Sequence, residues 1–273
     1  MSTSSIFKSA ILGVIIVAIS AAAYFLIAPT NQAQALSSLS SIQPGDLFRG
    51  ETHSAVYFMG TDGFRYVFPN QKTFDTWYEG DFSSVKFISD ADLTKVQMGG
   101  NATYKPGYKM VKIQSNPDTY AVSKGGELRH VTSEAIAIDL YGSNWNTKID
   151  DVPDGFFSNY YIGSAINSAG EFSVSGQLAA ATSINADKSL VAPVNMSITD
   201  SGYSPVGLTV DVGEPVRFTN NGSQKHTATG DALDWGTGTL NAGESYIKTF
   251  DEAGVYSFFD SYDSANTGAI YVE

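Results

Sequence analysis

The last eighty or so residues alternate apolar and polar side chains in short runs, and this pattern restricts their fold more than any other feature. Residues 208–212 (Leu-Thr-Val-Asp-Val) and 216–218 (Val-Arg-Phe) have the period of two that is typical of half-buried strands. Turn residues separate the runs at spacings found in β-sandwiches, at Gly213, Asn221-Gly222, Gly243 and Gly254. The alternation and the spacing of the turns predict an all-β sandwich over residues 190–273. A domain of this size can bury a core without disulfides or metal.

The same stretch carries motifs that are specific to one kind of sandwich. The segment 256–272 reads Tyr-Ser-Phe-Phe-Asp-Ser-Tyr-Asp-Ser-Ala-Asn-Thr-Gly-Ala-Ile-Tyr-Val, and His-Thr-Ala-Thr begins at residue 226. With residues 213–221, 234–240 and 250–256, these motifs resemble the strands and turns of cupredoxins, the small blue-copper proteins of the plastocyanin and amicyanin type. The resemblance implies a Greek-key sandwich closed by a hairpin over residues 256–272.

The sequence departs from this family at the positions where copper would bind. The family's closing hairpin carries Cys-x-x-His-x-x-Met-x-Gly, and here Asp260, Asp263 and Asn266 take the first three places while Gly268 keeps the last. His226 matches the family's N-terminal copper histidine. A type 1 site needs a thiolate with soft or imidazole ligands, and the chain has no cysteine. The resemblance therefore implies a degenerate copper site that has lost blue-copper electron transfer.

Four residues are the candidate metal ligands: His226, Asp260, Asp263 and Asn266. One imidazole with two carboxylates suits a divalent ion such as Zn²⁺ or Mn²⁺, and imidazole also gives weak binding of Cu(II). The alternative is that the Asp and Asn residues only form loops, since their short side chains bond nearby backbone amides in turns. We expect no cofactor and keep a divalent metal as the alternative.

An apparent internal repeat lies before the sandwich, with an offset of 64 residues. Residues 62–67 (Asp-Gly-Phe-Arg-Tyr-Val) recur as 126–131 (Gly-Glu-Leu-Arg-His-Val), so that Arg65 matches Arg129 (129 − 65 = 64). Each copy predicts a hairpin, a short helix over 71–78 or 133–141, and a second helix near Asp90 or Asp154. Because so small a unit cannot close a core alone, the copies 45–100 and 109–164 are predicted to form one α+β domain over residues 45–166.

The segments that flank this domain differ from it in composition. Residues 167–189 are rich in Ser, Ala and Gly, which predicts a linker or an edge strand, and 36–44 form a serine-rich spacer. Lys8 precedes an uncharged apolar run over 10–28, near the ~20 residues that span a bilayer. Ala-Gln-Ala at 33–35 offers a cleavage site, so residues 1–35 are predicted to be a signal peptide or an uncleaved membrane anchor. Both readings place the rest outside the cytoplasm, secreted or at the cell surface.

Composition and missing motifs exclude several functions. The net charge of −12, without any basic patch, argues against a nucleic-acid partner. The sequence contains no nucleophile elbow, phosphate-cradling glycine loop or His-Glu-x-x-His helix. His53 and His130 lie outside any metal-spacing motif, and we interpret them as structural. The sequence thus predicts a non-enzymatic binding or structural protein with a cell-envelope or protein partner. It would contact the membrane through the N-terminal helix only if that helix is not cleaved.

Overall fold

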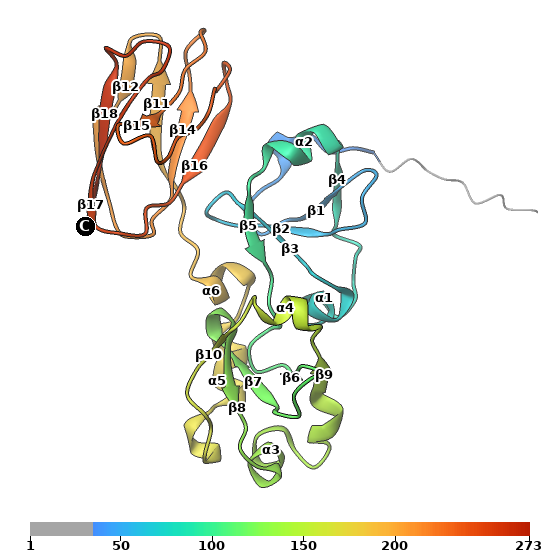
Figure 1. The fold of residues 1–273 in the computed structure, drawn as a ribbon. Helices are drawn as coiled ribbons and strands as arrows, with labels where there is room; N and C mark the ends of the chain where they lie inside the picture. Colours follow the sequence, from blue (N-terminus) through green and yellow to red (C-terminus); the bar gives the residue numbers. More distant parts are fainter. Residues whose placement is uncertain (1–34) are drawn as a thin grey trace, which may run out of the picture. The chain divides into compact units, whose positions relative to one another are not determined.

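The computed structural model describes residues 35–273 (Figure 1). The predicted signal peptide or anchor, residues 1–35, lies outside the described residues except for its last position. Among the residues that are described, no helix has the length and apolar character needed to cross a membrane. The chain is mixed α and β, with several sheets and few helices, as predicted in outline.

The first α+β unit is built on a five-stranded sheet with the order β4-β1-β2-β3-β5. The three central strands are antiparallel, and each edge strand pairs in parallel with its neighbour. The elements are η1 (Leu39–Ser41), β1 (Leu47–Gly50), β2 (Tyr57–Met59), β3 (Arg65–Val67), α1 (Gln71–Tyr78), β4 (Lys86–Ile88), α2 (Asp90–Lys95) and β5 (Met98–Asn101).

The second unit has a sheet of the same strand order and the same pairing directions, written β10-β8-β7-β6-β9. Its elements are β6 (Met110–Lys112), β7 (Tyr120–Ser123), η2 (Lys124–Gly126), β8 (Glu127–His130), α3 (Glu134–Tyr141), η3 (Trp145–Lys148), β9 (Ile149–Asp151), α4 (Asp154–Phe157) and β10 (Tyr161–Ile162).

Side-chain caps explain why the first helix of each unit begins where the sequence predicts. The Asn70 side chain accepts a hydrogen bond from the Thr73 amide at 2.9 Å, and the Ser133 hydroxyl accepts one from the Ile136 amide at 3.4 Å. Both bonds satisfy amides that the first helical turn leaves without partners. The predicted helix over 71–78 is confirmed, and Ser133 is the cap of α3 and not part of it.

The segment 167–189 is not the linker or edge strand that its composition predicts. It forms η4 (Ala169–Glu171), α5 (Val174–Ala180) and α6 (Ile184–Lys188), with Ser173 and Ser183 as helix caps. Phe172 joins the core of the second unit beside Met110, and Ile184, 1% exposed, joins the core of the first beside Phe58. A serine-rich composition predicts a flexible segment. Here, however, two of the serines cap helices, and the apolar residues Phe172 and Ile184 are buried.

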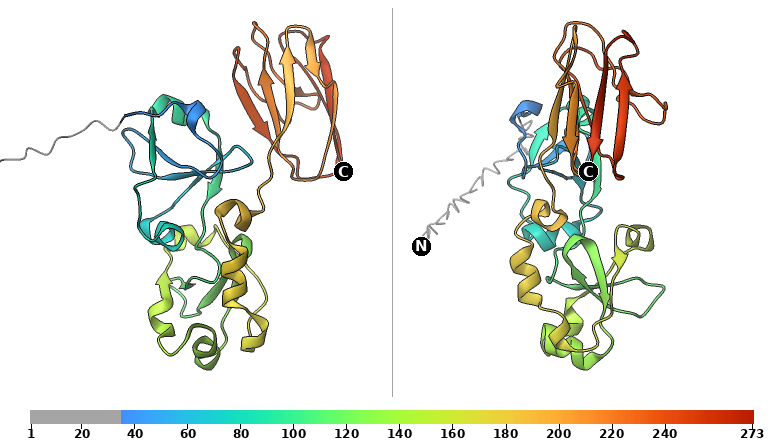
Figure 2. Two further views of the ribbon diagram at one scale, coloured as in Figure 1. Left: turned by 180° about the vertical axis from the view of Figure 1, so that it is seen from behind. Right: turned by 90° about the vertical axis from the view of Figure 1, so that its left-hand side faces the viewer.

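Two four-stranded sheets make up the C-terminal domain, with the orders β12-β11-β14-β16 and β13-β18-β17-β15 (Figure 2). Met196 and Phe218 of one sheet pack in a single core with Phe258 and Ile270 of the other, and all four are 0% exposed. The predicted sandwich is confirmed. Its strands are β11 (Val194–Thr199), β12 (Gly202–Ser204), β13 (Gly207–Val210), β14 (Val216–Asn220), β15 (Thr229–Gly230), β16 (Ser245–Lys248), β17 (Gly254–Phe259) and β18 (Thr267–Val272).

The packing of α6 gives a first prediction. Ile184→Ala should lower the free energy of unfolding by about 2–5 kcal/mol, because it leaves a cavity in the core of the first unit. Chemical denaturation of the purified chain measures the loss. Val191→Ala, at a side chain that is 51% exposed, is the control and should change stability by less than about 0.5 kcal/mol. Equal effects of the two substitutions would show that α6 does not contribute to this core.

Candidate functional site

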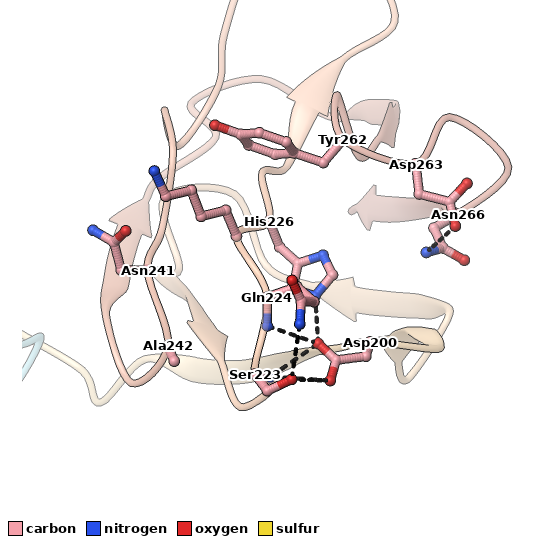
Figure 3. A pocket seen from close by; sticks show the side chains of 10 residues that line it. Asp200, Ser223, Gln224, His226, Asn241, Ala242, Tyr262, Asp263 and Asn266 are labelled. Atoms are coloured by element: carbon pink, nitrogen blue, oxygen red, sulfur yellow. Dashed lines mark hydrogen bonds and ion pairs between the residues drawn. The ribbon is translucent and has the colours of Figure 1, made fainter.

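Three loops meet at one end of the sandwich and bring the candidate site together (Figure 3). They are the turn after β11, which carries Asp200, the loop after β14, which carries His226, and the closing loop between β17 and β18, which carries Asp260. His226 exchanges two backbone hydrogen bonds with Leu240, at 3.1 and 2.9 Å, and these bonds fix the height of the imidazole in the loop.

The imidazole of His226 lies between two carboxylates and is 4% exposed. Its Nδ1 is 2.6 Å from Oδ2 of Asp260, and its Nε2 is 3.1 Å from Oδ1 of Asp200. Burial by itself lowers the pKa of His226, but the hydrogen bonds and charges of Asp260 and Asp200 outweigh burial and raise it. Below about pH 6.5 the ring is therefore an imidazolium that donates through both nitrogens.

Asp260, at the position of the family's copper cysteine, is 0% exposed and is surrounded by donors. Its Oδ1 accepts from the amides of Thr227 and Tyr262, each at 3.0 Å, while its Oδ2 faces His226. A carboxylate taken out of water is stable only when such partners satisfy it. Asp260 therefore holds the closing loop to the histidine loop.

Asp200 is the member of the site that sequence reasoning missed. Its carboxylate accepts from the amides of Ser223 and Gln224, at 2.9 and 3.0 Å, and from the Ser223 hydroxyl at 2.8 Å. These bonds to the backbone, joined by the one to His226, hold the pKa of Asp200 well below its usual range. The sequence signal for Asp200 is the Asp-Ser-Gly turn at residues 200–202, directly after the strand. Such turns are common in sandwiches, so the motif does not by itself indicate a site residue.

Asp263 and Asn266 line the mouth of the site and are bonded to their own loop. Asp263 accepts from the Ala265 amide and from the Asn266 side chain, both at 3.2 Å. The structure thus divides the four candidates into His226 with Asp260 and Asp263 with Asn266. Within residues 35–273, no group of three or more His, Cys, Asp or Glu residues is arranged to hold a metal ion.

The donors at this end do not fit a type 1 copper ion. The position that should supply a thiolate supplies a carboxylate, whose oxygens already accept bonds from two amides and an imidazole. Both nitrogens of the one histidine are engaged by carboxylates, so neither offers a lone pair while the ring is protonated.

No family model matches the sequence, and neither does any curated protein. Among solved structures, a purple cupredoxin from Nitrosopumilus maritimus is 24% identical over 29% of this chain and 99% of its own, with a TM-score of 0.28. A copper-containing nitrite reductase from Thermus scotoductus is 25% identical over 30% of this chain and 23% of its own, with a TM-score of 0.29. A reduced amicyanin variant is 23% identical over 30% of this chain and 82% of its own, with a TM-score of 0.28.

The ion pairs of His226 predict a pH-dependent stability. Since the pKa of His226 is raised above its unfolded value of about 6.5, its contribution is fully present below about pH 6.5 and is lost as the pH rises through the folded-state pKa. His226→Gln should therefore destabilise the chain by about 3–5 kcal/mol at pH 6, because it leaves Asp260 buried without its cation. The difference from wild type should shrink toward pH 9.

Denaturation curves at several pH values measure this difference. His130→Gln is the matched control, since the His130 ring is more exposed and lies 3.7 Å from Asp118. It should change stability little and without this pH profile. The same profile in both variants would contradict the role given to His226. At the acid end, the lowered pKa of Asp200 makes its contribution present above about pH 4 and lost as the pH falls.

Proposed function

We propose that this chain is an extracytoplasmic, non-enzymatic binding protein whose sandwich keeps a cupredoxin-like frame without type 1 copper electron transfer. The observation that carries the proposal is the placement of His226 between Asp260 and Asp200. The histidine expected to bind copper donates both of its nitrogens to carboxylates, so the end of the sandwich is held by an ion pair.

The location outside the cytoplasm rests on the start of the sequence. The apolar run over 10–28, preceded by Lys8, is the only leader-like or membrane-anchor-like segment in the sequence. The chain is acidic and lacks cysteine, a composition that suits a soluble surface and provides no thiol chemistry. We infer that residues 36–273 face the cell exterior, either released or tethered by the leader.

The two units before the sandwich support a binding or structural role. Their sheets share one topology, and we infer that they arose by duplication. Residues of both units are joined by α6, where Asn185 accepts from the Thr61 amide at 2.9 Å and Asp187 accepts from the Gly125 amide at 2.8 Å. A duplicated scaffold of this kind presents a fixed surface to a partner in the cell envelope.

Metal analysis tests the loss of the copper site. The purified chain mixed with Cu(II) should show no intense visible copper–thiolate band, because no thiolate is present, whereas a cupredoxin with an intact site shows it under the same conditions. Elemental analysis of chain grown with Zn²⁺, Mn²⁺ and Cu²⁺ should give no stoichiometric metal. One equivalent of metal that disappears in both His226→Ala and Asp263→Asn would overturn the proposal in favour of a divalent-metal site.

Protease accessibility tests the location. A protease added to intact cells that express the full chain should digest residues 36–273, while a cytoplasmic marker protein stays intact. A chain that is digested only after the cells are lysed would place it inside and contradict the extracytoplasmic half of the proposal.

A further inference from the structure

The loops around His226 line an open cavity of about 730 Å³ at the end of the sandwich (Figure 3). We propose that this cavity binds a neutral saccharide. The inference rests on the proposed loss of copper, because a copper ion would occupy the same end of the domain. The volume lies within the range of about 300–1,000 Å³ that small-molecule sites have.

The charges on the cavity wall favour a ligand without net charge. Asp200 and Asp263 are opposed by Lys225, and the His226 ring is already bonded to Asp260 and Asp200. A phosphate group would meet two carboxylates there. A metal ion would meet amide hydrogens that already point at Asp200, and a histidine whose two ring nitrogens both face carboxylates. The charges that line the cavity are therefore unfavourable both for an anion and for a metal cation.

The polar groups of the wall match a polyhydroxyl compound. Gln224, Asn241 and Asn266 bring side-chain amides to the cavity. One N–H of each amide is bonded within the protein, which leaves a second N–H and the carbonyl oxygen for the hydroxyls of a sugar. Figure 3 shows Asn241 and Asn266 on opposite sides of His226, so the cavity has amide groups on both of these sides. Asp263 accepts two hydrogen bonds, which leaves further lone pairs of its carboxylate for ligand hydroxyls.

Tyr262 supplies the apolar contact that a sugar ring needs. Its side chain is 56% exposed, yet it is held in place, since its hydroxyl lies 3.0 Å from Oγ1 of Thr239 and its amide donates to Asp260 at 3.0 Å. A large exposed aromatic ring fixed beside a polar cavity presents a flat face to the C–H groups of a pyranose. Because the ring is already ordered, stacking costs little conformational entropy.

Saturation-transfer difference NMR on the full chain tests the inference. The probes are D-glucose, D-galactose, D-mannose, N-acetyl-D-glucosamine and the disaccharides maltose and cellobiose, with glucose 6-phosphate as the charged counterpart. We expect transfer to at least one neutral sugar and weaker transfer to glucose 6-phosphate than to glucose. No transfer to any neutral probe, or stronger binding of the phosphate, overturns the inference.

Variants locate the binding. Tyr262→Ala should weaken the affinity for the bound sugar about tenfold, and Tyr262→Phe should keep most of it, because the ring remains. Tyr271→Ala, at a tyrosine of β18 that is 47% exposed and lies outside this cavity, is the matched control and should leave the affinity unchanged. Equal weakening by Tyr262→Ala and Tyr271→Ala would overturn the assignment. A chain that binds no sugar and shows no blue copper band refutes this inference alone, whereas a blue band refutes the proposed function.

Discussion

The ion pairs of His226 determine the arrangement of the loop end of the sandwich. Asp200 follows β11 in one sheet and Asp260 follows β17 in the other, so the imidazolium between them joins the two sheets at that end. A buried ion pair stabilises a fold only when further hydrogen bonds satisfy both partners. Here backbone amides meet that condition: those of Thr227 and Tyr262 at one carboxylate, and those of Ser223 and Gln224 at the other.

The same arrangement determines how the loops at this end are held. The imidazole of His226, bonded to Asp260 and to Asp200, ties its own loop to the other two. The closing loop is anchored by Asp260, by the Ser261 amide, which donates to the Thr227 hydroxyl at 2.8 Å, and by the Tyr262 hydroxyl beside Thr239. Asp263 and Asn266 bond to each other at the rim. The cavity lies beside His226 and is lined by Asp263 and Asn266 as well (Figure 3).

The parts of the fold that local chemistry determines were predictable from the sequence. Alternation and glycine turns predicted the sandwich, and the helices predicted over 71–78 and 133–141 correspond to α1 and, less its first residue, α3. The partnership of His226 with Asp200 was not predictable, because it joins residues 26 apart through loop packing that no short motif records. The prediction for the segment 167–189 was wrong because composition alone indicates a linker there. Its helices depend on the burial of Phe172 and Ile184 in cores that other parts of the chain form.

The burial of Ile184 also explains a difference between the two α+β units. Tyr66 and His130 occupy matching positions in β3 and β8, the third strand of each unit. Only Tyr66 lies in the core that receives Ile184, where it is 6% exposed and bonds to Asp62. His130 packs 5.6 Å from the Tyr120 ring, and its side chain remains 36% exposed. A large phenol ring fills the space where a helix covers the strand. A smaller imidazole ring is enough where the strand faces solvent. The two copies therefore differ where their surroundings differ, although their topology is the same.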